Sequence, residues 1–227
     1  MKQVGILFIL LLTACSAFSQ ESETRQLGKF TAIRVGEAID VYLKKGEKES
    51  AKVEVENVRL SDVITDLSGN QLRVHMRSGN YQNRRTVKVY VTYVSIDRIG
   101  ASSAASVLGE GTIKSTSLEI SASSAANVEL SIEADDVTVD VGSAADVTLE
   151  GKAKTLRVDA GSAGSVDAYN LEAEKVNAEV STAGTAKVNV TKSLDAEASS
   201  GGSIRYRGNP TSTNTDSSSG GSVKKTS

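Results

Sequence analysis

The second half of the chain repeats one short box of small residues at a nearly constant interval. The four clearest copies are Ser-Ala-Ala-Ser-Val at 103–107, Ser-Ala-Ala-Asn-Val at 124–128, Ser-Ala-Ala-Asp-Val at 143–147 and Ser-Ala-Gly-Ser-Val at 162–166. Three looser copies begin at Thr182, Ser200 and Ser219, so that successive copies start 21, 19, 19, 20, 18 and 19 residues apart. A fixed period of this size is typical of stacked structural units, each of which cannot bury its apolar face alone.

Apolar and polar residues alternate on both sides of each box. Before the third box Val137, Val139 and Val141 alternate with polar residues, and the alternation resumes after the box at Val147 and Leu149. This period of two predicts strands with one buried face. A helix is excluded because apolar residues at i and i+2 would point to different sides of it.

The alternation continues through the box, where the side chains on the buried face become small. We interpret each box as a tight corner between two strands, so that about 19 residues make one coil and successive coils stack in parallel at ~4.8 Å. The sequence therefore predicts an all-β fold, a right-handed parallel β-helix (β-solenoid), because parallel crossovers are overwhelmingly right-handed. The same parity places the first hydroxyl of each box inside the coil, in a structural column of Ser103, Ser124, Ser143, Ser162, Thr182 and Ser200.

The composition agrees with coils of small and β-branched side chains. The 227 residues include one Pro, and aromatic residues make up 4% of the chain. The formal net charge is −2, and no basic stripe contains interleaved aromatic residues, so we expect no nucleic-acid partner.

The N-terminus has the pattern of an export signal that is too short to span a membrane: Lys2 followed by an apolar run at 4–12. Two processing routes fit the next residues. Leu-Thr-Ala-Cys at 12–15 matches a bacterial lipobox, which would remove residues 1–14 and lipidate Cys15, whereas cleavage after Ser19 would remove 1–19 and release a soluble protein. We therefore expect an exported protein, either a lipoprotein of the outer membrane or periplasm whose lipid is its membrane contact, or a secreted one. Cys15 is the one cysteine, so no disulfide is expected.

Residues 24–99 are also strand-like but lack the repeat. Their pattern resembles the head GIN domain family in four segments: Arg25, Phe30, Ile33 and Val35 with Ala-Ile-Asp-Val-Tyr-Leu at 38–43 and Gly46; Gln-Leu-Arg-Val at 71–74; Val-Lys-Val-Tyr-Val at 87–91; and Ile-Gly-Ala-Ser-Ser-Ala at 99–104. The resemblance covers about residues 24–205. That family, described as a "putative auto-transporter adhesin" and common in Gram-negative envelopes, implies a secreted or lipid-anchored β-helical domain and supplies no catalytic residues. We divide the mature chain into an N-terminal β part of this domain at 24–99, repeat coils of the same β-helix at 100–223 and a tail at 224–227.

One polar column is a candidate site. Stepping by the coil period predicts a row of acids on the outer face just before the boxes, formed by Asp140, Asp159, Glu179, Glu197 and Asp216. Stacked like charges are unfavourable, so the row is interpreted either as a solvated ladder or as a site for a cation or a glycan, with Arg157 as a nearby counter-charge. His75, the one histidine, alternates with apolar residues in a strand and is expected at the solvent face without a catalytic partner. No cofactor and no Cys- or His-based metal site is expected.

These features predict a protein that is not an enzyme. The preferred interpretation is a cell-envelope domain for adhesion, which binds a glycan or an envelope protein through flat polar faces. The alternative is a structural module that self-associates into a homo-oligomer through an open strand edge at the C-terminus. A polysaccharide lyase or hydrolase depends on the acid row alone, because coils of 18 to 21 residues leave no long loops to enclose a substrate.

Overall fold

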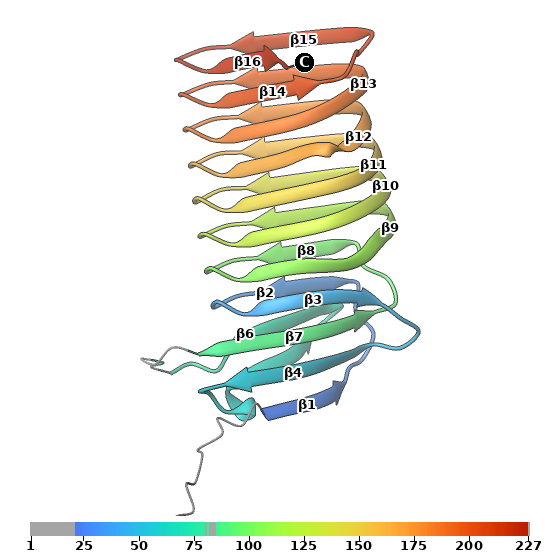
Figure 1. Cartoon of the computed structure of the whole chain (residues 1–227), viewed down its shortest axis with the longest axis vertical. Coiled ribbons are helices and arrows are strands. Elements are labelled where there is room, and N and C mark those ends of the chain that lie inside the picture. The colour runs from blue at the N-terminus through green and yellow to red at the C-terminus, as the bar shows by residue number, and fades with distance from the viewer. Residues whose placement is uncertain (1–20, 80, 82–84, 227) are drawn as a thin grey trace, which may run out of the picture.

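The computed structural model describes residues 21–79, 81 and 85–226. These residues form a parallel β-solenoid in which 16 strands belong to one continuous sheet, as the repeat predicted (Figure 1). The first eight strands are β1 (Glu21–Gln26), β2 (Ala32–Val35), β3 (Asp40–Lys45), β4 (Ser50–Glu56), β5 (Val63–Ser68), β6 (Gln71–Met76), β7 (Thr86–Tyr93) and β8 (Arg98–Ala101), with a 3-10 turn η1 (Leu60–Asp62) before β5. Within the described part of the chain, no helix is long and apolar enough to span a membrane.

The regular coils follow, each paired with the one before it in sequence. Their strands are β9 (Ser106–Ala122), β10 (Asn127–Val141), β11 (Asp146–Ala160), β12 (Ser165–Val180), β13 (Thr185–Ala198), β14 (Ser203–Arg207), β15 (Ser212–Ser217) and β16 (Ser222–Lys225). Neighbouring coils pair in parallel. β10 and β11 pair without a register shift, so that Val128 lies beside Val147 and Val139 beside Val158, whereas the pairs β9–β10, β11–β12 and β12–β13 contain shifts near the charged edge. Buried side chains from Phe30 to Ile204 form one cluster, so the two parts of the chain share a single core.

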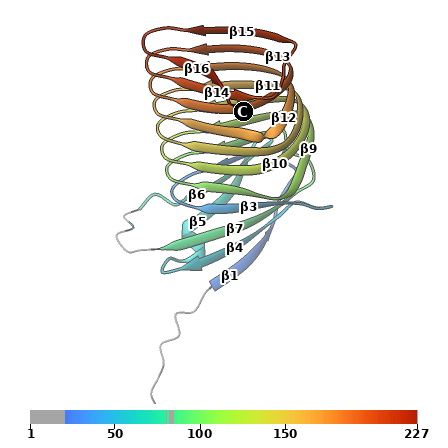
Figure 2. The ribbon, with the colours of Figure 1, turned by 45° about the horizontal axis from the view of Figure 1, so that its top comes forward.

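Each regular coil has two strand segments and two corners. In β10 the first segment ends at the buried Ala134, two outward residues follow at Asp135 and Asp136, and the second segment begins at the buried Val137. We call the outer side of the segments that follow the boxes the front face and the outer side of those that precede the boxes the back face. The boxes form the turn edge, and the opposite bends form the charged edge. Figure 2, with the C-terminal end turned forward, shows β16 on the front and β15 on the back of the last coil.

At the turn edge the chain reverses through two residues in the left-handed conformation. Ser124 and Ala125 have φ of 54° and 59°, and the amide of Ala126 donates to the carbonyl of Ser123 at 3.2 Å. Two left-handed residues closed by such a bond are the features of a type I′ turn. The amide of Ala125 donates to the carbonyl of Ser143 at 3.0 Å, so backbone hydrogen bonds also link one turn to the next.

The predicted hydroxyl column lies outside the coil, so its inward assignment was wrong. The first residue of each box is exposed, at Ser103, Ser124, Ser143, Ser162, Thr182 and Ser200. The turn leaves two consecutive residues on the outside, whereas a period of two assumes strict alternation. The third box residue is the buried one, as Ala126 at 1% exposure shows.

That third residue is Ala in the first three boxes and Gly in the last four. A Cβ on Gly202 would lie 2.5 Å from the carbonyl oxygen of Val180 in the preceding coil. Coils at the C-terminal end therefore approach each other too closely at this corner for any larger residue.

The turn edge includes one corner that the box search did not find. Glu37 and Ala38 have φ of 63° and 56°, and the amide of Ala38 donates to the carbonyl of Ser103 at 2.9 Å. This corner joins β2 to β3 below the first box. The repeat does not predict this corner, because its sequence, Gly-Glu-Ala-Ile at 36–39, has no Ser and has Ile39 at the buried third position.

The N-terminal part does not stack in chain order. β6 pairs with β2, and β7 with β3, so the coil of β6 and β7 lies beneath the coil that precedes it in sequence. β8 then pairs with the other side of β2, and β9 with the other side of β3. Antiparallel strands complete this end, with β5 on β6, β4 on β7 and β1 outermost on β4.

The two ends of the solenoid are closed by polar strands. At one end β1 carries alternating charged residues, which oppose pairing with a further strand. At the other end β15 places Thr213, Thr215 and Ser217 where the coil below has Leu194, Ala196 and Ala198. The last coil thus exposes hydroxyls instead of apolar side chains, as terminal repeats of solenoids commonly do. β16 runs through Lys225, beyond the expected start of the tail at 224.

Candidate binding faces

The predicted acid row lies on the back face in unbroken register. Asp140 pairs with Asp159, Asp159 with Glu179, Glu179 with Glu197, and Glu197 with Asp216, and all five side chains are exposed. Burial raises the pKa of Asp140 above its ordinary value, and repulsion from Asp159 and Glu119 raises it further. The row is therefore a column of like charges on a flat face.

No counter-charge satisfies this column within the described residues. None of the five carboxylates there makes an ion pair or a hydrogen bond, and Arg157 pairs with none of them. Nor does any cluster of three or more His, Cys, Asp or Glu side chains among these residues have the geometry to hold a metal ion. A shallow hollow of about 400 Å³ lies over Asp140 and Asp159, lined mostly by small residues of β9 and of the turns that follow β9, β10 and β11.

His75 lies far down the back face, at the irregular end. Its side chain is 37% exposed, and its Nε2 is 3.4 Å from Oδ1 of Asp66. The other carboxylate oxygen of Asp66 accepts a hydrogen bond from Arg73. Its Nδ1 is 2.9 Å from the carbonyl oxygen of Met76. Both ring nitrogens thus contact groups of its own hairpin, and neither makes a hydrogen bond to a serine or threonine hydroxyl among the described residues.

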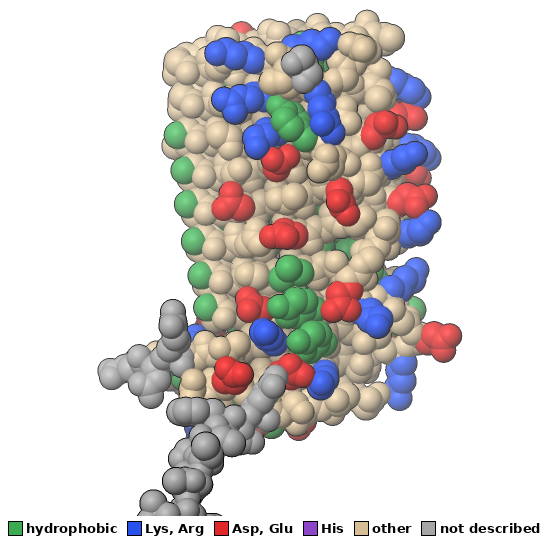
Figure 3. All heavy atoms as spheres, viewed as in Figure 1, with side chains coloured by type: hydrophobic (Ala, Val, Ile, Leu, Met, Phe, Trp, Pro, Cys, Tyr) green, Lys and Arg blue, Asp and Glu red, His purple; other side chains and the backbone are tan. Residues whose placement is uncertain are grey.

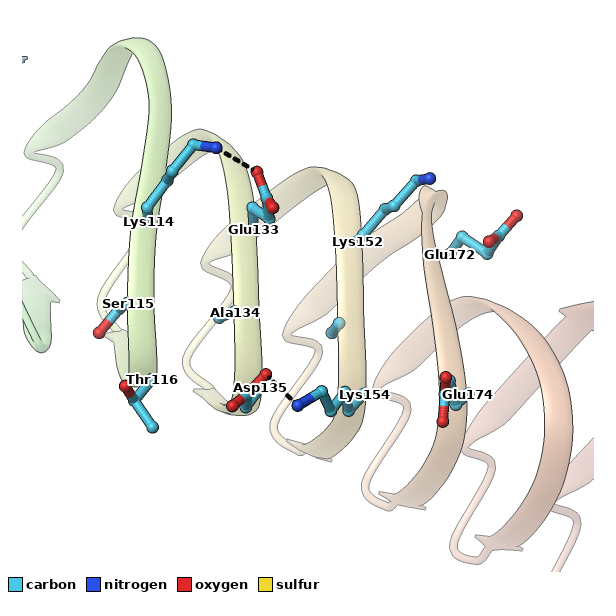
Figure 4. A pocket seen from close by; sticks show the side chains of 11 residues that line it. Lys114, Ser115, Thr116, Glu133, Ala134, Asp135, Lys152, Lys154, Glu172 and Glu174 are labelled. Atoms are coloured by element: carbon cyan, nitrogen blue, oxygen red, sulfur yellow. Dashed lines mark ion pairs between the residues drawn. The ribbon is translucent and has the colours of Figure 1, made fainter.

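The charged edge carries a ladder that the sequence analysis missed (Figure 4). Lys114, Glu133, Lys152 and Glu172 are in register on successive coils and alternate in sign. A second column contains Asp135, Lys154, Glu174 and Lys192. Ion pairs join Lys114 to Glu133 at 2.7 Å, Lys154 to Asp135 at 2.8 Å and Lys192 to Glu174 at 2.6 Å. The signal was available, since a step of 19 residues from Lys114 gives Glu133 and then Lys152.

A hollow of about 630 Å³ lies between the two columns of this ladder. Side chains of both signs project around it, as Figure 4 shows for Lys152 and Glu172. The hydrogen bond from Lys114 lowers the pKa of Glu133, and that from Lys192 lowers the pKa of Glu174. Since opposite charges offset one another here, the charged edge mainly ties neighbouring coils together.

A basic cluster covers the front face of the C-terminal coils, where Lys and Arg side chains gather in Figure 3. Lys187, Arg205 and Lys224 are in register on β13, β14 and β16, with Arg207 and Lys225 farther along β14 and β16. Lys187 pairs with Asp167 at 2.8 Å, whereas Arg205 and Lys224 have no partner among the described residues. The cluster therefore presents an excess of positive charge to solvent.

Tyrosines on the front face support the strands. Tyr42 and Tyr90 are neighbours in register, and their rings stack at 5.0 Å with an interplanar angle of 17°. The ring of Tyr169 lies beneath the Arg207 guanidinium at 5.3 Å, and its hydroxyl is 3.0 Å from Oγ1 of Thr226. Each of these rings thus packs against at least one neighbouring side chain of the front face.

The family model for "Putative auto-transporter adhesin, head GIN domain" matches residues 29–210. The chain belongs to the head GIN domain family. This match confirms the resemblance seen in the sequence. No curated protein matches this head GIN domain protein.

Solved structures share the fold of this head GIN domain protein. A "putative adhesin" from Bacteroides fragilis NCTC 9343 has a TM-score of 0.85 at 21% identity, covering 92% of this chain and 98% of its own. A "putative adhesin" from Parabacteroides merdae ATCC 43184 has a TM-score of 0.76 at 19% identity, covering 92% and 96%. A "putative lipid binding protein" from Parabacteroides distasonis ATCC 8503 has a TM-score of 0.71 at 18% identity, covering 92% and 97%.

The predicted lipidation site lies outside the described residues. Cys15 and both proposed cleavage points precede Glu21, where β1 begins. The two processing routes therefore remain predictions.

Proposed function

We propose that this protein is a non-catalytic adhesion domain of the cell surface that binds a charged partner through the flat faces of its C-terminal coils. The observation that carries the proposal is the unpaired charge on those coils. Five carboxylates on the back face have no partner among the described residues, and the same is true of Arg205 and Lys224 on the front face. Unpaired charges on a flat surface favour steered, salt-sensitive contacts with a broad partner.

The shape of the coils argues against catalysis as the proposed role. Catalytic groups gain most of their effect in sites that exclude water. The acid row instead lies on an open strand face, over a shallow hollow, with no His, Lys or Arg partner in the described chain. The expected partner is a glycan or an envelope protein with a charged surface.

The ends of the solenoid suggest how the domain is presented. β1 and the basic cluster lie at opposite ends of the molecule (Figure 1). If the lipobox is used, lipid on Cys15 would hold the β1 end near a membrane and direct the C-terminal coils away from it. Release after Ser19 would give a secreted form with the same binding faces.

Lipid binding, which is named for the Parabacteroides distasonis protein, receives little support from this surface. Among the residues described, Leu67 at 38% and Val94 at 37% exposure are the exposed large hydrophobic side chains. Two such side chains supply little fully exposed apolar surface for acyl chains.

Adhesion can be tested with beads that carry the exported protein. We expect them to adhere to at least one charged surface in a panel of acidic glycans, neutral glycans, basic and acidic proteins and the protein itself, with adhesion falling as salt rises. The control protein carries Lys29→Glu, Lys44→Glu and Lys48→Glu, which change the net charge at the other end of the solenoid. It should adhere like the unaltered protein, because its C-terminal faces are unchanged. Beads that adhere to nothing would refute the proposal. So would turnover of an acidic polysaccharide that is lost in Asp159→Asn.

A further inference from the structure

The last three turns carry opposite charges at matching places on the two faces. The last three boxes begin at Thr182, Ser200 and Ser219. An acid lies three residues before the first residue of each of these boxes, and a base lies five residues after it. The pairs are Glu179 with Lys187, Glu197 with Arg205, and Asp216 with Lys224. The acids are in register on the back face and the bases are in register on the front face.

This arrangement is confined to the C-terminal coils. At the same two places the two preceding coils have Asp159 with Asp167 and Asp140 with Thr148, so neither has a base at that front-face place. Arg207 adds further positive charge near the front row. The C-terminal end is thus polarised across its thickness, with a negative back and a positive front.

Most of these charged side chains make no ion pair with other described residues of the molecule. Of the six side chains, Lys187 alone has an ion pair among the described residues, with Asp167 at 2.8 Å. Stacking three carboxylates in one column and three cations in another costs energy in an isolated molecule. A partner with the complementary pattern would remove both costs.

We propose that this protein associates with further copies of itself, side by side and in parallel, with the front face of one copy against the back face of the next. The inference rests on the proposed function and names its partner. Both faces belong to the same coils, so moving one copy sideways without rotation brings each base opposite an acid at the same height. The spacing matches automatically, because both rows have the ~4.8 Å repeat of paired strands.

The association has a defined symmetry. A front-to-back contact leaves one free front and one free back, so it propagates into rows instead of closing into a dimer. In a row all β1 ends lie on one side, which suits chains that are anchored at that end. Each contact relies on exposed charges, so we expect it to be weak for single molecules, sensitive to salt and strengthened where many copies are displayed together.

Sedimentation velocity of the exported protein over a range of concentrations tests the proposal. We expect association at about 20 mM salt and a dissociation constant at least about tenfold weaker at about 500 mM. A front variant carries Lys187→Glu, Arg205→Glu and Lys224→Glu, and a back variant carries Glu179→Lys, Glu197→Lys and Asp216→Lys. Each variant alone should remain monomeric, with a circular dichroism spectrum and melting curve showing that it is folded.

Mixing the two variants gives the decisive result. The front variant is acidic on both faces and the back variant is basic on both, so an equimolar mixture should associate again in alternating rows. The Lys29→Glu, Lys44→Glu, Lys48→Glu protein has the same net charge as the front variant and should associate like the unaltered chain. A mixture that stays monomeric, or an unaltered protein that stays monomeric at low salt, would overturn the inference. If such a monomeric protein still adheres to an acidic glycan or another protein, self-association fails while the proposed adhesion stands.

Discussion

The N-terminal part and the regular coils build one core by different means. From β9 onward each coil lies on the one before it in sequence, and the corners are Ser-Ala, Thr-Ala or Ser-Gly turns that are linked by backbone hydrogen bonds. Before β9 the coil of β6 and β7 lies beneath that of β2 and β3, and antiparallel strands cover its open side. The core residues differ too, since Phe30, Ile39 and Met76 fill the first part while the later coils use many alanines.

The comparison shows that the N-terminal part covers the lower end of the core, whereas the regular coils extend the core by repeating one unit. A coil between two similar coils needs only nearest-neighbour contacts. The first coil has no coil below it, so large side chains and the antiparallel strands β4, β5 and β1 must bury its lower surface. The last coil solves the same problem with hydroxyl side chains on β15.

The largest effect should follow from a charge inside a regular coil. Val158 is 1% exposed, and Val158→Asp would bury an unpaired carboxylate at a cost of several kcal/mol. We expect loss of the folded coils in circular dichroism and urea denaturation. Arg157→Asp places the same residue on the exposed neighbour and should melt close to the unaltered protein. Equal melting of both variants would mean that the inward assignment of Val158 is wrong.

The second largest effect should follow from a larger residue at the third position of a box in the C-terminal coils. Gly202→Ala forces a Cβ to within 2.5 Å of the Val180 carbonyl oxygen, so overpacking should destabilise the protein by about 1–3 kcal/mol. The reverse change in an earlier coil, Ala145→Gly, removes a buried methyl without a clash and should cost about 1–2 kcal/mol, from the lost burial and the freer unfolded chain. Urea denaturation of both variants measures the two costs. A Gly202→Ala protein as stable as the unaltered chain would contradict the close approach of the C-terminal coils.

The regular coils were readable from sequence because each repeats the same local problem. The period gave the stacking of the boxes, and the alternation gave the buried valines. The corner was misread because left-handed residues interrupt alternation, which no count of apolar positions reveals. The stacking order of β2, β6 and β8 could not be read either, because it depends on pairing between strands distant in sequence.

The acid row was predicted from the same period, whereas the basic rows were not. Asp140 and its successors are all acids, so a step along the chain finds them. At the front face the corresponding place holds Thr148, Asp167, Lys187, Arg205 and Lys224 in turn, so the type of side chain changes from coil to coil. The same step from Lys187 gives Arg205 and Lys224, and the register of β13, β14 and β16 places the three cations side by side.

Acidity should affect the two regions in opposite directions. The pKa of Asp140 is raised by burial and by Asp159 and Glu119, so the folded state takes up a proton more readily than the unfolded chain. Asp140 therefore destabilises the fold at neutral pH, and this loss disappears as the pH falls below the ordinary value of 3.8. The pKa of Asp66 is lowered, first by its hydrogen bond from Arg73, so its stabilising effect is present at neutral pH and is lost as the pH falls through that lowered pKa.

Two matched variants measure this contrast. Asp140→Asn should raise the melting temperature at neutral pH, and Asp66→Asn should lower it, with both changes shrinking towards about pH 3. Both substitutions keep the size of the side chain, so each serves as the steric control of the other. A shift of the same sign in both variants at neutral pH would contradict the assignment.

The smallest effect should be a gain in stability at the outer residue of one turn. Ala144 has φ of 57°, a conformation that costs a residue with a Cβ about 1–2 kcal/mol, whereas the last two turns have Gly201 and Gly220 at the same place. Ala144→Gly removes that strain but adds freedom to the unfolded chain, so the net gain should lie between zero and about 1 kcal/mol. Because Ala144 is exposed, no packing is lost. Urea denaturation beside Ala145→Gly is the measurement, since the same substitution one residue later should destabilise. A clear loss for Ala144→Gly would mean that this turn does not hold two left-handed residues.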